Sequence, residues 1–264
     1  MDNLQILDLE SNLLSSLPGP AFKHLKSLRI LTVNNNPITH LGKNDFKYLS
    51  SIETLKFENC QIKNIEPSSF RPMNRLYELN LANNQLRHLH YQIKKSFSRL
   101  TVLRLYNNQW KCDCHLRWLR ISLQSIPNWD FGSNSPICES PNNLRGVSWK
   151  NVAPDKFACS STIQVPSATS VEVVLGSNAT LKCTAWGDPA PIVTWFMKNE
   201  QLNENYNNVF DVNEGEIDEL NSETGSSVES VLHVLSAKKS DAGSYMCLAE
   251  NLAGKSEVMY NLLV

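Results

Sequence analysis

The first 110 residues repeat one pattern of apolar residues every 24 positions, and this repeat limits the fold more than any other feature. Each copy reads L-x-x-L-x-L-x-x-N/C-x-L, and the copies begin at Leu4, Leu28, Ile52, Leu76 and Leu100 without an insertion or a deletion. A single copy cannot bury its own leucines, so neighbouring copies must stack on one another. The sequence therefore predicts a curved solenoid whose concave face is lined by strands.

The spacing and the residue types are those of leucine-rich repeats. We expect an α/β-type solenoid over residues 1–109, with parallel strands and an irregular convex side. A phenylalanine recurs in the convex segment of the first three repeats, at Phe22, Phe46 and Phe70, and should form a spine there. In the fourth repeat Lys94 takes this position and Phe97 follows it, so we expect a rearranged convex segment beside a strand that stays in register.

A polar column accompanies the leucines at the end of each strand. Its members are Asn12, Asn36, Cys60, Asn84 and Asn108. A buried asparagine here can both donate to and accept from the backbone of the bend. Cys60 takes the cysteine alternative of the motif, which accounts for the odd cysteine among seven. A free reactive thiol or an intermolecular disulfide at Cys60 is the alternative.

Residues 110–160 change from leucines to tryptophans and cysteines, beginning Trp110-Lys-Cys112-Asp-Cys114-His115. With Cys138 and Cys159, this segment resembles the cysteine-rich C-terminal cap of extracellular leucine-rich repeats. The resemblance implies that Cys112 pairs with Cys138 and Cys114 with Cys159, closing the open end of the core. Zinc bound by the C-x-C motif and His115 is the alternative, but the spacing is not that of a zinc finger or ribbon.

Residues 161–264 consist of short alternating runs typical of strands. Trp195 follows Cys183 by twelve residues, and Tyr245 precedes Cys247 by two. These spacings mark an immunoglobulin-like, I-set-like all-β sandwich, in which Cys183 and Cys247 bridge the sheets and Trp195 packs on the bridge. The acidic stretch between residues 200 and 230 predicts a long solvated loop. A calcium site at residues 211–216 is a weaker alternative, because the glycine and the terminal glutamate of a calcium loop are misplaced.

The net charge changes sign between residues 160 and 161, where the sequence pattern also changes. Residues 1–160 hold 20 Lys and Arg against 12 Asp and Glu, whereas residues 161–264 hold 5 against 14, so the two parts differ in sign. Seven cysteines indicate an oxidising, secreted or cell-surface location. No signal peptide, N-terminal cap or apolar run of membrane-spanning length is present. We therefore expect an interior fragment or a truncated gene model, attached to a membrane only through a segment outside this chain.

The order of repeats, cysteine-rich cap and immunoglobulin-like domain resembles the cell-surface leucine-rich-repeat and immunoglobulin superfamily. The segments Trp110–Trp118 and Cys247-Leu-Ala-Glu-Asn-Leu-Ala-Gly254 look most like Kekkon-type proteins, and the acidic stretch is similar to that of the LRIG glycoproteins. The resemblance implies a receptor-like binding or adhesion module for a growth-factor receptor, a neuronal partner or another cell-surface protein. No catalytic motif, cofactor site, metal site or nucleic-acid interface is expected.

Three alternatives to this function remain open at this stage. Peroxidasin-like peroxidases and Trk-like receptor kinases also carry such repeats before immunoglobulin domains. This chain would then be the recognition arm of a larger enzyme. The third alternative is a secreted antagonist. Sequence beyond residue 264 would separate them.

The concave face near the cap is the predicted partner-binding surface. One outward column holds Asp8, Thr32, Lys56, Asn80 and Arg104, and a second holds Glu10, Asn34, Glu58, Ala82 and Tyr106. Because Arg and Tyr dominate interface energetics, the predicted contacts are Tyr77, Arg104 and Tyr106, with Lys56 beside them. Ordinary solvated surface is the alternative.

Two further surface features follow from local sequence. The basic residues Arg87, Lys94, Lys95 and Arg99 predict weak polyanion binding, for example to heparan sulfate, with a solvated convex edge as the alternative. The opposite charges of the two parts also suggest homophilic contact between copies. Asn178-Ala-Thr180 is a glycosylation sequon, and strand alternation places Asn178 outward.

Overall fold

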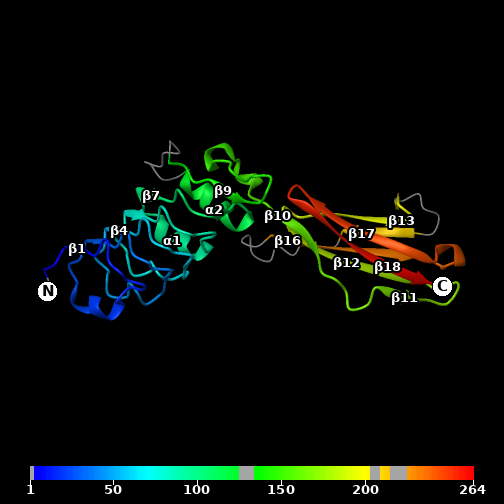
Figure 1. The fold of residues 1–264 in the computed structure, drawn as a ribbon. Helices are drawn as coiled ribbons and strands as arrows, with labels where there is room; N and C mark the ends of the chain where they lie inside the picture. The colour runs from blue at the N-terminus through cyan, green and yellow to red at the C-terminus, as the bar shows by residue number, and fades with distance from the viewer. Residues whose placement is uncertain (1–2, 125–133, 203–208, 215–224) are drawn as a thin grey trace. The chain divides into compact units, whose positions relative to one another are not determined.

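The computed structural model describes residues 3–124, 134–202, 209–214 and 225–264 and divides into two compact units, Met1–Phe157 and Ala158–Val264 (Figure 1). This boundary lies three residues before the expected joint after residue 160. The reason is that β10 (Cys159–Ile163) pairs with a strand of the second unit. None of the described helices is long and apolar enough to cross a membrane.

The first unit is built on one parallel sheet that takes one short strand from each repeat. The strands lie in the order β1 (Ile6–Asp8), β2 (Ile30–Thr32), β4 (Thr54–Lys56), β6 (Glu78–Asn80) and β7 (Val102–Arg104). Each pair keeps an offset of 24 residues, as in Leu31 opposite Leu55 and Leu55 opposite Leu79. The repeat period therefore sets the strand register, and the predicted solenoid is confirmed.

The convex side is irregular. It contains η1 (Gly19–His24), the short parallel pair β3 (His40–Leu41) and β5 (Asn64–Ile65), and then η2 (Tyr91–Ile93) and α1 (Lys94–Phe97) in the fourth repeat. The ring centroids of Phe46 and Phe70 lie 5.9 Å apart, and those of Phe70 and Phe97 lie 6.1 Å apart. Phe97 thus continues the spine from one helical turn later, while Lys94 is exposed.

The asparagine column lies where the sequence places it and joins neighbouring repeats. Asn84 Nδ2 donates to the carbonyls of Phe57, Leu81 and Ala82, and its Oδ1 accepts from the Ile62 amide. Asn36 and Asn108 make equivalent contacts. The residue before each column member has a positive φ, which explains why asparagine recurs at positions 35, 59, 83 and 107.

The cap closes the end of the repeat core with aromatic rings. It contains β8 (Trp110–Lys111), α2 (Cys114–Leu123), β9 (Cys138–Ser140), η3 (Trp149–Asn151) and η4 (Pro154–Lys156). The Trp149 ring lies 5.5 Å from both the Trp110 and the Phe157 rings, and all three side chains are fully buried. The aromatic residues therefore cover leucines that a sixth repeat would otherwise cover.

The second unit is a two-sheet β sandwich. One sheet has the order β10, β12 (Ala179–Asp188), β16 (Ser226–Val234), β15 (Val209–Glu214). The other has the order β11 (Ser170–Glu172), β18 (Gly254–Leu263), β17 (Gly243–Asn251), β13 (Ile192–Met197), β14 (Glu200–Gln201), and η5 (Lys239–Asp241) precedes β17. The predicted all-β immunoglobulin-like sandwich is confirmed.

The prediction of one long loop between residues 200 and 230 is wrong at both ends of this interval and at residues 209–214, where the structure has strands. Strands β14, β15 and the start of β16 occupy residues of this interval, because they extend the two sheets. Residues 203–208 and 215–224 lie outside the described residues, and so does the end of the proposed calcium loop at residues 211–216.

Candidate protein-binding face of the repeats

The short strands present alternate side chains to the concave face. Leu31, Leu55 and Leu79 point into the core and are fully buried, so the residues on either side of each leucine point outward. The outward positions that follow these leucines are Asp8, Thr32, Lys56, Asn80 and Arg104. Asn80 and Ala82 are nevertheless buried, which corrects the expectation that both are exposed.

Glu58 explains the burial of Asn80, because its carboxylate gathers donors from two later repeats. It accepts hydrogen bonds from Asn80 Nδ2 at 2.8 Å, Asn83 Nδ2 at 2.9 Å and the Tyr106 hydroxyl at 3.3 Å. Its backbone amide donates to Asn34 Oδ1 at 2.8 Å. Glu58 therefore fixes the side chains around it on the concave face.

Tyr106 is held as a hydrogen-bond donor. Burial raises the pKa of its hydroxyl, and the neighbouring Glu58 carboxylate raises it further. The hydroxyl therefore stays protonated at neutral pH. Its half-buried ring is fixed beside an outward face, so a partner binding there would lose little side-chain freedom.

Ion pairs between neighbouring repeats order the guanidinium groups on this side. Arg104 Nη1 lies 2.6 Å from Glu78 Oε1, and Arg29 pairs with both carboxylate oxygens of Glu53 at 2.7 and 2.9 Å. Arg29 lowers the pKa of Glu53 through this hydrogen bonding. Each pair joins two neighbouring repeats, Arg29 and Glu53 within one column and Glu78 and Arg104 across two columns.

The four predicted contact residues do not form one uniform group. Lys56 and Arg104 share the outward column, Tyr106 lies in the next column, and Tyr77 precedes β6 in the flanking column of Arg29 and Glu53. The Tyr77 side chain is exposed, and Lys56 has no carboxylate within ion-pair distance among the described residues. Sequence reasoning missed the organising role of Glu58, although a carboxylate two residues after a strand was visible.

The cysteines occupy structural positions. Cys112 and Cys138 form one disulfide, Cys183 and Cys247 form another, and Cys114 and Cys159 are also disulfide-bonded. Because both sulfurs of the C-x-C motif are in disulfides, that motif offers no thiolate to zinc. Cys60 is free and buried, its Sγ lies 3.5 Å from the Val33 carbonyl oxygen, and burial raises the pKa of its thiol.

At the start of the cap, a buried carboxylate collects positive charge. Asp113 Oδ1 accepts from the His115 amide at the beginning of α2, and its carboxylate lies near Lys111, His88 and His115. Hydrogen bonds from His115, His88 and Lys111 outweigh the opposing effect of burial and hold the pKa of Asp113 well below its usual range. Asp113 therefore stays ionised and anchors the helix to the fourth repeat through His88.

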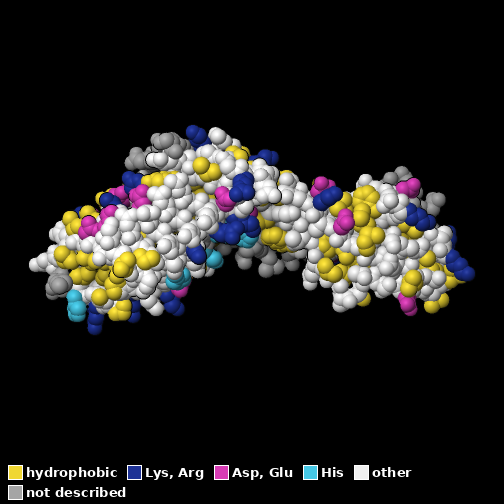
Figure 2. Space-filling model, viewed as in Figure 1, with side chains coloured by type: hydrophobic (Ala, Val, Ile, Leu, Met, Phe, Trp, Pro, Cys, Tyr) yellow, Lys and Arg dark blue, Asp and Glu magenta, His cyan; other side chains and the backbone are white. Residues whose placement is uncertain are grey.

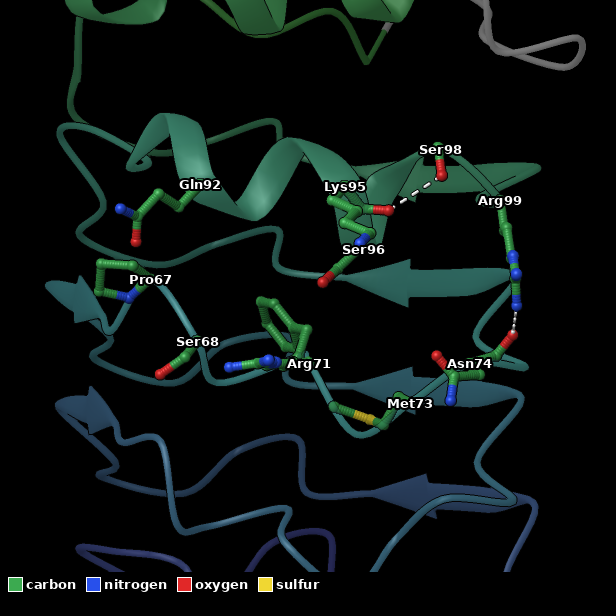
Figure 3. Close-up of a pocket in the computed structure, with 11 residues that line it drawn as sticks. Pro67, Ser68, Arg71, Met73, Asn74, Gln92, Lys95, Ser96, Ser98 and Arg99 are labelled. Atoms are coloured by element: carbon green, nitrogen blue, oxygen red, sulfur yellow. Dashed lines mark hydrogen bonds between the residues drawn. The ribbon is translucent and has the colours of Figure 1, made fainter.

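The remaining predicted sites are at the surface. Asn178 is exposed, and its Oδ1 accepts from the Ser236 amide at 2.9 Å. Arg87, Lys94, Lys95 and Arg99 are exposed, and the Lys94 ammonium lies 5.1 Å from the Tyr91 ring centroid. Lys95 and Arg99 line a pocket of about 470 Å³, whereas Arg87 and Lys94 do not (Figure 3).

Family models match both parts of the chain. Residues 2–62 match the leucine rich repeat model, and residues 161–264 match the immunoglobulin I-set domain model. Among solved structures, an immunoglobulin chain of a titin M10–obscurin-like 1 complex is 26% identical, with 40% of this chain and 94% of that chain covered and a TM-score of 0.33.

Curated relatives include a mouse leucine-rich repeat, immunoglobulin-like domain and transmembrane domain-containing protein 3, 30% identical over 59% of this chain and 21% of its own length. A mouse leucine-rich repeat and immunoglobulin-like domain-containing nogo receptor-interacting protein 2 is 31% identical over 58% of this chain and 23% of its own length. The human probable oxidoreductase PXDNL is 29% identical over 58% of this chain and 9% of its own length.

The matched part of this chain thus spans less than a quarter of each of these relatives. The same two domain types occur in the names of the two mouse relatives. The chain therefore combines leucine-rich repeats with an immunoglobulin I-set domain, which is consistent with the leucine-rich-repeat and immunoglobulin superfamily.

Proposed function

We propose that this chain is the extracellular protein-binding part of a cell-surface receptor-like or adhesion protein. The concave surface of β4, β6 and β7 is its binding face. The observation that carries this proposal is the set of hydrogen bonds that the Glu58 carboxylate accepts. One of them fixes the Tyr106 hydroxyl, close to Arg104, which forms an ion pair with Glu78. Tyr and Arg held in place offer large contact area and directional donors at low entropic cost.

The surrounding chemistry supports a protein partner. Lys56 and Arg104 offer positive charge, Glu58 and Glu78 offer carboxylates, and Tyr77 offers an exposed ring. Aromatic side chains and arginine are enriched in protein interfaces, and a polar rim surrounds them. The partner proposed on these grounds is an extracellular protein domain. The family resemblance adds the proposal that it is a growth-factor receptor or a neuronal surface protein. A second copy of this chain is an alternative partner.

Similarity to a probable oxidoreductase favours one second candidate. In that case the same face would serve as the recognition part of a longer enzyme. Full-length transcript sequence distinguishes the two, because it shows whether a membrane helix or a catalytic domain follows residue 264.

The test is a binding screen of the purified chain against an array of extracellular domains. The variant Tyr77→Ala/Arg104→Ala/Tyr106→Ala should weaken binding to each specific hit by about 2–4 kcal/mol, because it removes the anchoring groups together. The control is Gln61→Ala/Lys63→Ala/Asn64→Ala, which changes three exposed residues of the return segment in the third repeat. The proposal fails if both triple variants bind every hit as tightly as the original chain.

A further inference from the structure

One position of the repeat is basic in all four convex segments that precede the cap. Its members, here called the convex basic row, are Lys23, Lys47, Arg71 and Lys95. All four side chains are exposed. The 24-residue strand register places equivalent positions of successive repeats next to one another. Lys23, Lys47 and Arg71 each directly follow a phenylalanine of the spine, and the ring centroids of Phe46 and Phe70 lie 5.9 Å apart. In the rearranged fourth repeat Lys95 lies two residues before the spine residue Phe97, and it meets Arg71 at the pocket that both residues line.

The cations of the row are available for binding. Among the described residues, none of the four lies within ion-pair distance of a carboxylate, and the Lys47 ammonium lies 5.6 Å from the Tyr48 ring centroid. The carboxylates of Asp45 and Glu66, in the same convex segments, accept from the amides of Gly42 at 2.6 Å and Lys43 at 3.0 Å. Their hydrogen-bonding capacity is therefore used locally. Figure 2 shows Lys and Arg side chains along the lower edge of the repeats.

A pocket of about 470 Å³ lies where the third and fourth repeats meet on the row. Figure 3 shows Ser68 and Arg71 on one convex segment, and Gln92, Lys95 and Ser96 on the helical segment next to it. Every charged side chain among the described lining residues is basic. This volume falls in the range of small-ligand sites and suits a sugar ring.

The pocket combines an apolar base with polar walls. Phe70 and Met73 form its base but are almost fully buried, and the half-buried Pro67 beside them offers carbon surface to the C–H groups of a ring. Ser68 and Ser96 supply hydroxyls, and the Arg71 guanidinium can donate two parallel hydrogen bonds to an oxyanion. Arg99 donates to the Asn74 carbonyl at the far end, which leaves Arg71 and Lys95 as the principal cations.

We propose that the convex basic row binds a linear sulfated acidic polysaccharide, with one sulfated sugar in the pocket between Arg71 and Lys95. Cations on successive repeats complement a linear polyanion, and the pocket complements a sugar unit. A flat anionic surface would contact the exposed cations without filling the pocket. The site lies outside the concave face and is independent of the protein-binding function.

The sequence cluster of basic residues coincides with this site only in part. Lys95 belongs to the row and Arg99 lines the pocket, but Arg87 and Lys94 do neither. Arg71, which lies 24 residues before Lys95, was absent from the cluster because it is distant in sequence. The assignment therefore shifts from a contiguous stretch to a column that crosses repeats.

Titration calorimetry of the full chain with a heparin-derived octasaccharide tests the proposal. The variant Arg71→Gln/Lys95→Gln should raise Kd about tenfold or more at about 0.05 M NaCl, because two charge-assisted contacts are lost. Binding should weaken steeply at about 0.5 M NaCl. Lys150→Gln/Lys255→Gln is the charge-matched control and should change Kd by less than about twofold, since both residues are exposed and off the row. The melting temperatures of both variants should equal that of the original chain.

Two further probes separate sulfate recognition from general attraction. The same octasaccharide without its sulfates keeps its carboxylates and should bind at least about tenfold more weakly. Vesicles of phosphatidylserine and phosphatidylcholine should bind the original chain and the row variant equally. The proposal would be overturned if the row and control variants lost the same octasaccharide affinity, or if the desulfated octasaccharide bound as tightly as the sulfated one. It would also be overturned if the row variant lost vesicle binding that the original chain and the control variant show. The last result would assign the row to a membrane surface.

Discussion

The repeat unit is held together by pairs of residues 24 positions apart, whereas the immunoglobulin unit combines local hairpins with pairs of segments that lie far apart in the sequence. Leu55 stacks between Leu31 and Leu79, but Ala179 lies opposite Val234 and Cys183 is joined to Cys247 across 64 positions. A repeat therefore depends on its two neighbours, while the sandwich depends on long-range closure. A substitution in the repeats should therefore destabilise mainly the neighbouring repeats, whereas one in the sandwich should destabilise the whole immunoglobulin unit.

The largest difference should come from removing the intersheet disulfide. Closing a loop of 64 residues lowers the entropy of the unfolded chain, so Cys183→Ala/Cys247→Ala should destabilise the immunoglobulin unit by about 4 kcal/mol. Calorimetric melting should show this transition shifting down while the repeat transition stays in place. A parallel shift of both transitions would contradict the separation into two units.

A core leucine sharpens the comparison within the solenoid. Leu79 is fully buried between two repeats, so Leu79→Ala should cost about 3 kcal/mol by leaving a cavity. Leu7 is half-buried in the first repeat, and Leu7→Ala should cost about 1 kcal/mol. Urea unfolding followed by tryptophan fluorescence measures both. Equal losses would mean that the position in the stack does not matter.

The polar column should show a smaller graded effect. Asn84→Ala leaves three carbonyls and one amide without their partner and should cost about 2 kcal/mol. Cys60→Ala removes one weak sulfur contact and should cost about 1 kcal/mol. Non-reducing peptide mapping should also find Cys60 as a thiol. A larger cost at Cys60 than at Asn84, or Cys60 in a disulfide, would count against this assignment.

The cap offers a test by pH. The pKa of Asp113 is depressed in the folded state, so its contribution is complete above the unfolded value of about 4 and is lost as pH falls below it. Asp113→Asn should therefore cost about 1 kcal/mol at neutral pH, and the gap to the original chain should close in acid. Urea midpoints at several pH values give this difference. A gap that stays constant down to pH about 2 would exclude the electrostatic explanation.

The smallest effect is expected at the predicted glycosylation site. Asn178 is exposed, and glutamine keeps the amide, so Asn178→Gln should change stability by less than about 0.5 kcal/mol. Secretion from animal cells should yield a protein whose mass falls on glycosidase treatment, and the variant should lack this change. An unmodified original chain would remove Asn178 from the sites of this protein.

Regular spacing made most of the fold readable from sequence. Three features lie at fixed spacings: the leucines, the asparagine column and the Cys183–Trp195–Cys247 frame. Backbone geometry fixes the role of a residue at each of these spacings. Strands β14 and β15 inside the predicted acidic loop were missed because polar composition indicated solvent rather than the edge of a sheet. Edge strands tolerate such residues, since one side faces water.

The sequence by itself determined that a solenoid with a closed end precedes an immunoglobulin-like sandwich, because period and spacing act through the backbone. Only the tertiary structure decided which side chains meet across repeats. Examples are the Glu58 carboxylate with Tyr106, 48 residues later, and Arg71 with Lys95 around one pocket. Those contacts depend on rotamers, burial and the offset between stacked segments, and a sequence pattern specifies none of these.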